Sequence, residues 1–311
     1  MGKIAFIFPG QGAQYVGMGR QIAQEYPAAA NVFKEASESL GFDVESMIFE
    51  GDDETLKITE NTQPTILTAS IACMQPLLEK GIKPDFVAGL SLGEYSAHVA
   101  AGTLSFKDAV ALVKKRGKYM QEAVPVGVGT MAAILGLDND IVKECCAQAA
   151  SEGIVEPANF NCPGQVVVAG EIRAVEKAVE LAKGKGARRS MILPVSAPFH
   201  CSLLKPAGEQ IAQELNKIEF HDIQVPVVTN VTAQIVTDQS QVKDLLVRQV
   251  SSSVLWEECV KTMINEGVDT FVEIGPGKAL SGFVKKIDKD VRMLNIDDLD
   301  SLNKTLTELG V

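Results

Sequence analysis

Short, uninterrupted apolar runs alternate along this chain with longer segments in which apolar residues recur at helical spacing. One such run at residues 4–8 ends at Pro9-Gly10, and a second at 86–88 leads directly into Gly89. Runs of this length that are bounded by turn residues are typical of buried strands in a parallel sheet. The remaining pattern of this half predicts helices over 21–40, 63–80, 92–101 and 106–123.

The pattern changes at the glycines of segment 127–129 and again at the prolines of segment 194–198. Between these edges the predicted order is strand, helix, strand, strand, helix, strand, which is the ferredoxin-like order. The predicted elements are strands at 131–137, 154–159, 165–170 and 188–193, and helices at 140–150 and 174–182. Glycine-rich and proline-rich edges are typical of domain boundaries. We therefore expect a small domain at 127–196, inserted into a large domain formed by 1–126 and 197–311.

After this insertion the pattern again resembles that of the large α/β domain. It predicts helices over 203–217, 242–250 and 256–266, and strands over 225–228 and 270–273. We find no internal repeat and no low-complexity segment that would indicate a repeat architecture or a long linker.

Composition narrows the class of protein. The chain has 311 residues, 46% of them hydrophobic, which is enough for a large core. A net charge of −11 disfavours non-specific binding to nucleic acid, whose backbone is also negative. No stretch approaches the roughly 20 apolar residues of a membrane span, and the N-terminus lacks a signal peptide pattern. The six cysteines are scattered without a C-x-x-C pair, which indicates reduced thiols in the cytoplasm.

The motif Gly-x-Ser-x-Gly at residues 89–93 places Ser91 between a predicted strand and a predicted helix. In that context the motif forms a nucleophile elbow, in which the glycines permit a tight turn and the serine hydroxyl is exposed. The backbone N–H of Leu92 would then face a developing oxyanion. The alternative is a glycine-flanked serine in an ordinary turn. The expected fold is accordingly a large α/β-hydrolase-like domain with a parallel sheet and a nucleophile elbow, plus an inserted ferredoxin-like small domain.

A nucleophilic serine needs a general base, and the chain holds three histidines, His98, His200 and His221. His98 lies too far along the helix after the elbow to reach back, and His221 lies in a polar turn. His200 follows a proline-containing loop just past the small domain and is the best candidate, although it could instead cap the following helix. No distinctive acid stands between Ser91 and His200. A dyad in which an amide or a backbone carbonyl orients the imidazole fits that absence.

Arg116 is the other residue with candidate chemistry. It lies in the basic run 114–118, a pattern typical of a solvated helix surface. Its register also matches the apolar positions of the same helix, which are Ala109, Leu112, Val113 and Met120. A buried arginine needs an anion, and its planar fork matches a carboxylate. No protein residue suggests itself as that partner, so we expect a substrate carboxylate.

Seven short blocks of this sequence resemble signature motifs of malonyl-CoA:acyl carrier protein transacylases and of the acyltransferase domains of polyketide and fatty acid synthases. The blocks lie at 8–14, 89–95, 116–121, 158–165, 199–200, 230–232 and 273–277. They follow the family order and cover essentially the whole chain. No single block is specific, but together they identify the chain as similar to this family.

The resemblance implies a ping-pong transfer, in which Ser91 takes malonyl from coenzyme A and passes it to the phosphopantetheine thiol of acyl carrier protein. His200 would act as base and then as acid, while Arg116 would bind the malonyl carboxylate. The backbone N–H groups of Gln11 and Leu92 would form the oxyanion hole. The resemblance also implies that Gln249 orients the histidine by supplying an amide-type acceptor. It implies three further substrate-binding residues, which are Met120, Phe199 and Asn159.

Two positions bear on specificity. Many members of this family have histidine before the serine, and this chain has Leu90, which transfers no group, so we expect little consequence. Phe199 resembles the residue of malonyl-selective members. A bulky ring there would crowd an α-methyl branch, so we expect malonyl to be preferred over methylmalonyl by about 1–3 kcal/mol at most.

Other functions compete with the malonyl transferase. An elbow-type esterase or thioesterase is disfavoured by Arg116 and by the missing acid, and a non-catalytic carrier-binding module would require an inert Ser91. An acyltransferase of a polyketide pathway would use the same site, and a free-standing chain favours fatty acid synthesis. We expect a cytoplasmic monomer whose partners are malonyl-CoA and acyl carrier protein, with no metal, no cofactor, no nucleic acid and no membrane.

Overall fold

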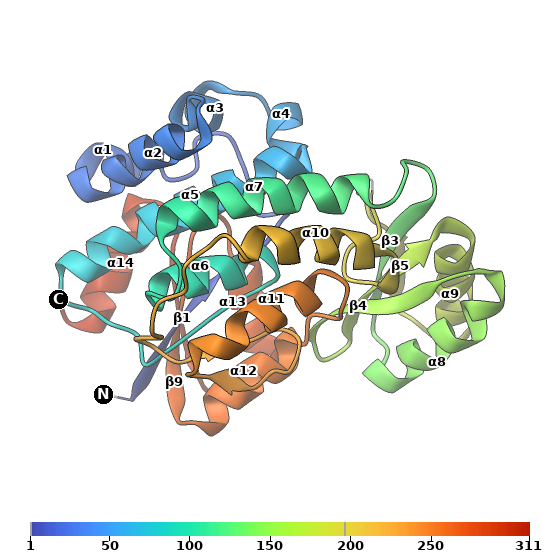
Figure 1. Ribbon diagram of the computed structural model, residues 1–311. Coiled ribbons are helices and arrows are strands. Elements are labelled where there is room, and N and C mark those ends of the chain that lie inside the picture. Colours follow the sequence, from blue (N-terminus) through green and yellow to red (C-terminus); the bar gives the residue numbers. More distant parts are fainter. Residues whose placement is uncertain (1, 196) are drawn as a thin grey trace.

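A computed structural model describes residues 2–195 and 197–311 of the chain, and two sheets organise it (Figure 1). The larger sheet has six strands in the order β10-β9-β1-β2-β7-β8, and every pair is parallel except β7 with β8. In that order the strands are β10 (Arg292–Ile296), β9 (Val268–Ile274), β1 (Lys3–Phe8), β2 (Phe86–Gly89), β7 (Val227–Val228) and β8 (Ile235–Val236). The predicted strands at 4–8, 86–89 and 270–273 are confirmed, whereas only the last two residues of the predicted strand at 225–228 pair.

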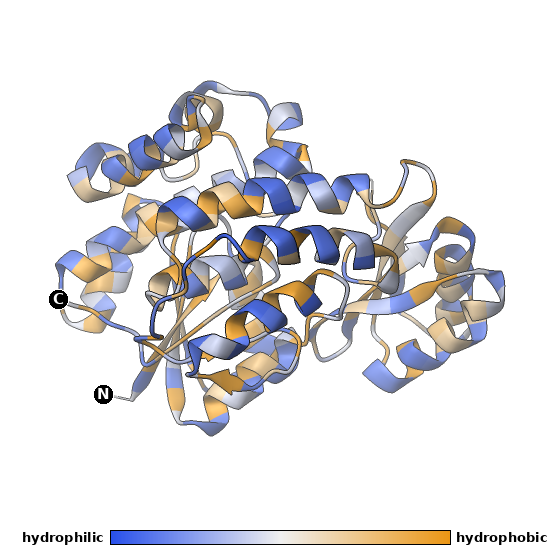
Figure 2. Ribbon diagram, in the orientation of Figure 1, coloured by the Kyte–Doolittle hydropathy of each residue, from blue (hydrophilic) through white to orange (hydrophobic). Residues whose placement is uncertain are grey.

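Alternation along the central strand β1 explains why helices cover both faces of this sheet. Phe6 and Phe8 belong to one buried cluster, and Ala5 and Ile7 belong to another. The helices in the first cluster are α1 (Arg20–Glu25), α2 (Pro27–Leu40), α3 (Val44–Glu50), α5 (Thr59–Glu79), α6 (Leu92–Ala100), α7 (Phe106–Glu122), α10 (Lys205–Leu215), α11 (Val242–Val250) and α14 (Leu299–Leu309). Those in the second are α12 (Trp256–Asn265) and α13 (Ala279–Ile287). Figure 2 shows hydrophilic residues along these outer helices.

Helix α5 crosses the core, as its length and apolar pattern predicted, and follows the short helix α4 (Asp53–Lys57). Thr62, Thr65 and Thr68 are buried in this helix without unpaired hydroxyls, because each hydroxyl donates to a main-chain carbonyl of the preceding turn. Thr65 Oγ1 donates to the carbonyl of Asn61 at 2.9 Å, and Thr68 Oγ1 donates to that of Pro64 at 2.7 Å. A helix satisfied in this way can carry polar side chains such as Gln63 into the centre of the molecule.

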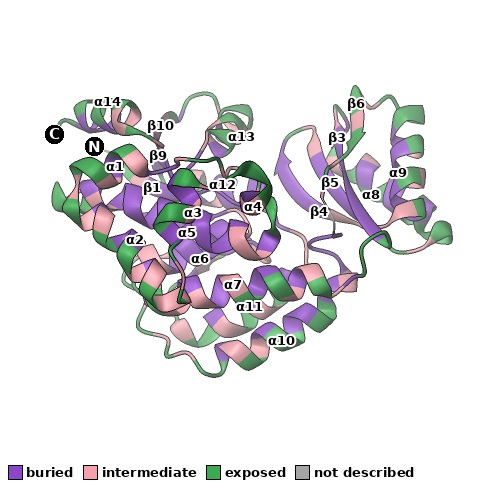
Figure 3. Cartoon of the chain, turned by 90° about the horizontal axis from the view of Figure 1, so that it is seen from above, coloured by how far each residue is buried: buried purple, intermediate pink, exposed green. Residues whose placement is uncertain are grey.

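The smaller sheet has four antiparallel strands in the spatial order β4-β5-β3-β6. Along the chain its elements follow in the order strand, helix, strand, strand, helix, strand. Its elements are β3 (Gly129–Leu135), α8 (Asn139–Ala149), β4 (Val155–Cys162), β5 (Gln165–Glu171), α9 (Ile172–Gly184) and β6 (Arg189–Ile192). The predicted element order is therefore confirmed. Helices α8 and α9 lie on the side of this sheet away from the larger body (Figure 3).

Strands β3, β4 and β5 of the smaller sheet are mostly buried on both faces, whereas the edge strand β6 is largely exposed. Ala132 and Ile134 of β3 pack with α8 and α9, whereas the alternate residues Met131 and Ala133 belong to the core cluster of the larger body. The two sheets thus share one continuous core on this side. The cleft between them holds the candidate site described below.

Two sequence-based expectations need correction. The predicted helix at 21–40 is two helices, because Tyr26 is extended (φ −115°, ψ 109°) and Pro27 starts a new helix. The predicted helix at 203–217 begins as a 3₁₀ turn at Ser202–Leu204. The elements α3, α4, β8, α13, β10 and α14 were not predicted. The expected domain boundary at 196 falls on a residue outside those that the structure describes.

Candidate active site

Ser91 lies at a sharp turn between β2 and α6, with φ 54° and ψ −103°. Such a conformation costs a non-glycine residue about 1–3 kcal/mol and persists only where the surroundings enforce it. Here the surroundings leave no room for side chains at either glycine of the motif. A Cβ on Gly89 would lie 1.9 Å from the carbonyl carbon of Gly93, and one on Gly93 would lie 2.1 Å from the main-chain oxygen of Phe8. The strand–turn–helix context predicted for the serine is confirmed.

Gly93→Ala is expected to lower the free energy of unfolding by about 1–3 kcal/mol, since the added methyl group overlaps the backbone of β1, which cannot move aside. Urea unfolding followed by circular dichroism measures this loss. The matched control is Gly282→Ala in helix α13, where a Cβ would meet nothing within 4 Å. That variant should be as stable as the parent or up to about 1 kcal/mol more stable. Equal stability of the two variants would contradict the steric account of Gly93.

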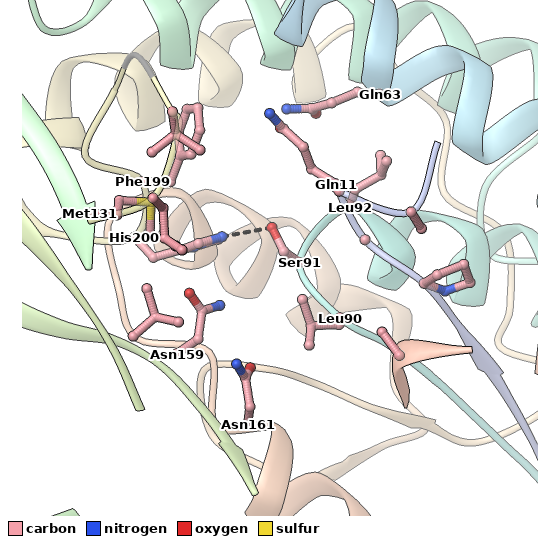
Figure 4. A pocket seen from close by; sticks show the side chains of 18 of the residues that line it. Gln11, Gln63, Leu90, Ser91, Leu92, Met131, Asn159, Asn161, Phe199 and His200 are labelled. Carbon is pink, nitrogen blue, oxygen red and sulfur yellow. Dashed lines mark hydrogen bonds between the residues drawn. The ribbon is translucent and has the colours of Figure 1, made fainter. Parts of the chain in front are cut away.

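His200 stands opposite the elbow, and its Nε2 lies 2.6 Å from Ser91 Oγ (Figure 4). Its Nδ1 lies 2.9 Å from the main-chain oxygen of Gln249. A carbonyl can only accept, so Nδ1 carries the proton and Nε2 presents its lone pair to the serine hydroxyl. This is the tautomer that a general base requires. The orienting acceptor is the main-chain carbonyl of Gln249, and not its side-chain amide.

Burial, followed by the positive charge of Arg116, lowers the pKa of His200 to about 3. The imidazole is therefore neutral at physiological pH. The other two histidines lie elsewhere. His98 is fully buried in α6 and both its ring nitrogens lack a partner among the described residues, while His221 is exposed.

Arg116 points inward from α7 and is 1% exposed, whereas its neighbours Lys115 and Lys118 are exposed. Gly117 allows α7 to pack closely against the start of α5, because a Cβ at this position would lie 2.4 Å from the main-chain oxygen of Thr59. The inward orientation predicted from its register is confirmed.

Arg116 has protein partners that the sequence did not indicate, although none of them is an anion. Its Nη1 donates to Gln63 Oε1 at 2.8 Å, and its Nη2 donates to Gln249 Oε1 at 2.9 Å and to Ser91 Oγ at 3.1 Å. The guanidinium also lies 5.2 Å from the ring centroid of Tyr95. These partners are amides, a hydroxyl and a ring, so the charge of the guanidinium is not neutralised by a direct ion pair among the described residues.

Glu94 and Asn230 complete the site, and sequence reasoning gave neither of them a role. Glu94 is 0% exposed, and its Oε2 accepts from the backbone N–H of Asn230 at 2.9 Å and from Gln249 Nε2 at 2.8 Å. Asn230 Oδ1 accepts from the backbone N–H of Ser91 at 2.7 Å. The available signal was position, because Glu94 follows the elbow motif directly and Asn230 lies in one of the recognised blocks.

Some backbone N–H groups around the elbow already donate hydrogen bonds within the protein, and others are candidate donors to an oxyanion. The N–H of Ser91 is bound to Asn230, that of Gly93 to the oxygen of Leu90, and that of Glu94 to the oxygen of Ser91. The N–H of Leu92 stands between them at the start of α6. A Cβ on Gly10 would lie 2.5 Å from the oxygen of Leu90, so the loop that carries Gln11 lies directly on the elbow.

A cavity of about 530 Å³ lies in front of Ser91, between the two sheets. Of the nine site residues predicted from the sequence, all but Gln249 line this cavity. The eight are Gln11, Ser91, Leu92, Arg116, Met120, Asn159, Phe199 and His200. Figure 4 shows that Gln11, Ser91, Asn159 and His200 converge from the loop after β1, the elbow, β4 and the loop around His200. Arg116 and Met120 come from α7. Gln63 also lines the cavity and was not predicted. The cavity therefore brings together a nucleophile, a neutral base and a buried cation.

Other kinds of site find no support in the part of the chain that the structure describes. There, His, Cys, Asp and Glu side chains form no group of three or more that could hold a metal ion. Within residues 2–195 and 197–311, no helix combines the length and hydropathy needed to cross a bilayer. All six cysteines are buried and unpaired, as expected.

Residues 5–296 match the family model described as "Acyl transferase domain". The fold and site thus belong to an acyltransferase, and the chain is a member of the acyl transferase domain family. The resemblance inferred from the seven blocks is confirmed.

The similar proteins carry a narrower name. The chain is 49% identical over 310 residues to the malonyl CoA-acyl carrier protein transacylase of Bacillus subtilis, covering 99% of this chain and 98% of that protein. The solved structure of the same-named enzyme from Clostridium perfringens matches with a TM-score of 0.96 and 49% identity, over 99% of this chain and 97% of that one. A malonyl-transacylase solved in complex with a type II polyketide acyl-carrier protein matches with a TM-score of 0.96 and 44% identity, over 98% and 99%.

Proposed function

We propose that this protein transfers the malonyl group of malonyl-CoA to the phosphopantetheine thiol of acyl carrier protein, and so supplies extender units for fatty acid synthesis. The observation that carries the proposal is the meeting of Ser91, neutral His200 and buried Arg116 at one cavity. The names of the similar proteins support the same activity. All these groups come from one chain, which supports action as a monomer.

In the first half-reaction His200 Nε2 takes the proton of Ser91 as Oγ attacks the thioester carbonyl. The N–H groups of Gln11 and Leu92 stabilise the resulting oxyanion. The C–S bond then breaks, His200 returns the proton to the departing thiolate of coenzyme A, and malonyl remains as an ester on Ser91. In the second half-reaction His200 takes the proton of the carrier thiol, whose sulfur attacks the ester, and Ser91 leaves with that proton.

Arg116 selects an acyl group that ends in a carboxylate. Its guanidinium lies against Ser91 Oγ and is directed by Gln63 and Gln249, so a malonyl carboxylate can replace the serine contact with a charge-assisted pair. Met120, Phe199 and Asn159 line the cavity around that position and complete the acyl-binding surface. A hydrolase would have no need of this cation. Carriers of fatty acid and polyketide pathways present the same thiol, and likeness to a transacylase solved with a polyketide carrier keeps that pathway as the second candidate.

The finer description of the fold is also a proposal. We assign residues 127–196 to a ferredoxin-like small domain, supported by the β4-β5-β3-β6 order of its antiparallel sheet. Residues 1–126 and 197–311 form a large α/β-hydrolase-like catalytic domain, supported by the parallel sheet and by the elbow at the end of β2.

Loading of malonyl should be insensitive to pH between 8 and 5.5. The lowered pKa of His200, about 3, means that the imidazole binds a proton only in stronger acid, so the base stays active. A histidine with the ordinary pKa of about 6.5 would lose activity about tenfold over that range. Rapid-mixing measurements of kcat/KM for loading test this. Burial raises the pKa of Glu94 to about 7, so the profile is also measured in Glu94→Gln. A decline centred near pH 6.5 in that variant would contradict the account of His200.

Intact-mass spectrometry tests the proposed function. Incubation with malonyl-CoA should add the mass of one malonyl group, and peptide mapping should place it on Ser91. Carrier protein bearing phosphopantetheine should then remove the adduct, whereas carrier without this arm should leave it in place. No mass increase, or an adduct that the carrier thiol does not discharge, would refute the transfer mechanism.

A further inference from the structure

We propose that Glu94 is a positioning residue of this transferase, whose carboxyl group fixes the orientation of the Gln249 amide and thereby aims Arg116 at the acyl carboxylate. This inference rests on the proposed malonyl transfer. Glu94 does not touch the cavity: its side chain is 0% exposed and it is not among the lining residues. Any effect on the reaction must therefore pass through the residues that it holds.

The Gln249 side chain connects Glu94 to Arg116. Its Nε2 donates to Glu94 Oε2 at 2.8 Å and to the main-chain oxygen of Ser91 at 3.0 Å. Its Oε1 accepts from Arg116 Nη2 at 2.9 Å. Glu94 and Arg116 are thus opposite charges bridged by one neutral amide.

The orientation of this amide is determined by its neighbours. Arg116 can only donate, so the end that faces it must be Oε1. Glu94 Oε2 also receives the backbone N–H of Asn230, which can only donate, so that oxygen must be an acceptor. If the acceptor at Glu94 were lost, Gln249 Nε2 would keep only the main-chain oxygen of Ser91 as a partner, and the amide could shift away from Arg116. The guanidinium would then lose the contact that aligns it.

The requirement is for an acceptor atom at this position and not for a charge. Oε2 can accept both N–H groups whether or not the carboxyl is protonated at Oε1, because Oε1 has no partner among the described residues. Burial raises the pKa of Glu94 to about 7, so both protonation states occur near neutrality. An amide of the same shape should therefore substitute for the acid, and a shorter acid should not.

Two variants separate geometry from charge. Glu94→Gln removes the charge but keeps an oxygen within reach of Asn230 and Gln249. Glu94→Asp keeps the charge but withdraws the oxygens by one methylene. For each variant, kcat/KM for loading of Ser91 is measured with malonyl-CoA and with acetyl-CoA, which lacks the carboxylate. The readout is the ratio of the two values, because damage to the fold or to the serine lowers both and leaves the ratio unchanged.

We expect the malonyl-to-acetyl ratio to fall at least tenfold in Glu94→Asp and to stay within about twofold of the parent in Glu94→Gln. Ser96→Ala is the matched control, since Ser96 is buried on the same helix and its hydroxyl has no partner in the described part of the chain. It should leave the ratio and the rates unchanged. An unchanged ratio in Glu94→Asp, or a collapse in Glu94→Gln, would overturn the inference. Failure of the parent enzyme to load malonyl would instead refute the proposed function itself.

Discussion

Replacing Ser91 by alanine is expected to abolish malonyl transfer, with a loss of at least roughly 10⁴-fold in kcat. No other nucleophile stands within reach of His200 Nε2, which lies 2.6 Å from Ser91 Oγ, among the residues that line the cavity. A ping-pong transfer cannot proceed without the covalent intermediate, so the oxyanion donors and Arg116 can only bind the substrate. Malonyl-CoA should therefore still bind the variant.

Two measurements check this result. Transfer to carrier protein is followed by gel shift or mass spectrometry, and binding of malonyl-CoA is followed by calorimetry. The control is again Ser96→Ala, which removes a hydroxyl without a partner from the same helix. If Ser91→Ala retained more than about one hundredth of the parent rate, coenzyme A and carrier would have to exchange malonyl directly, and the serine mechanism would be wrong.

Arg116→Ala is expected to give the second-largest effect, a loss of at least about 10²-fold in kcat/KM for malonyl loading. Removing one partner of a buried charge pair costs about 3–5 kcal/mol, because the remaining charge is left unpaired. The carboxylate of malonyl would meet only the amides of Gln63 and Gln249. Acetyl loading should fall far less, because acetyl carries no charge that requires the guanidinium.

Parallel assays with malonyl-CoA and acetyl-CoA give the comparison. Lys115→Ala is the matched control, because Lys115 is the adjacent residue on α7 and forms an exposed ion pair with Glu214 at 2.6 Å. Exposed pairs contribute about 0–1 kcal/mol, so this variant should behave as the parent. Equal losses for both acyl groups in Arg116→Ala would show that Arg116 supports only the structure of the site.

The parts of the site that the sequence predicted are those with local signals. Ser91 was found because its glycines, strand and helix are contiguous, and Arg116 because its register on one helix placed it with apolar residues. For Glu94 the only local signal was its position directly after the elbow motif, and an acid in a helix normally indicates exposure to solvent. Its burial depends on Asn230 and Gln249, which are more than 100 residues away along the chain. Gln63 is similar, because its role appears only where α5 meets α7.

The fold shows the same division. Proline at 27 is a local signal that a new helix begins, so the single helix predicted over 21–40 does not make use of it. Strand β10 was missed because Arg292 and Asn295 interrupt its apolar run, and it is recognisable only beside β9. Helix α14 depends on a capping box between Asp298 and Ser301, a signal that the hydrophobic pattern alone does not show.

The shared core of the two sheets links substrate range to stability. Met131 and Val167 line the cavity and also belong to the core cluster of the larger body. Each therefore has two functions, and a smaller residue that admits a bulkier acyl group also removes buried contacts that hold the sheets together. Evolution toward a new substrate at these positions would consume part of a limited stability reserve. Compensating substitutions elsewhere in the core should therefore accompany any natural change of acyl specificity at this wall of the cavity.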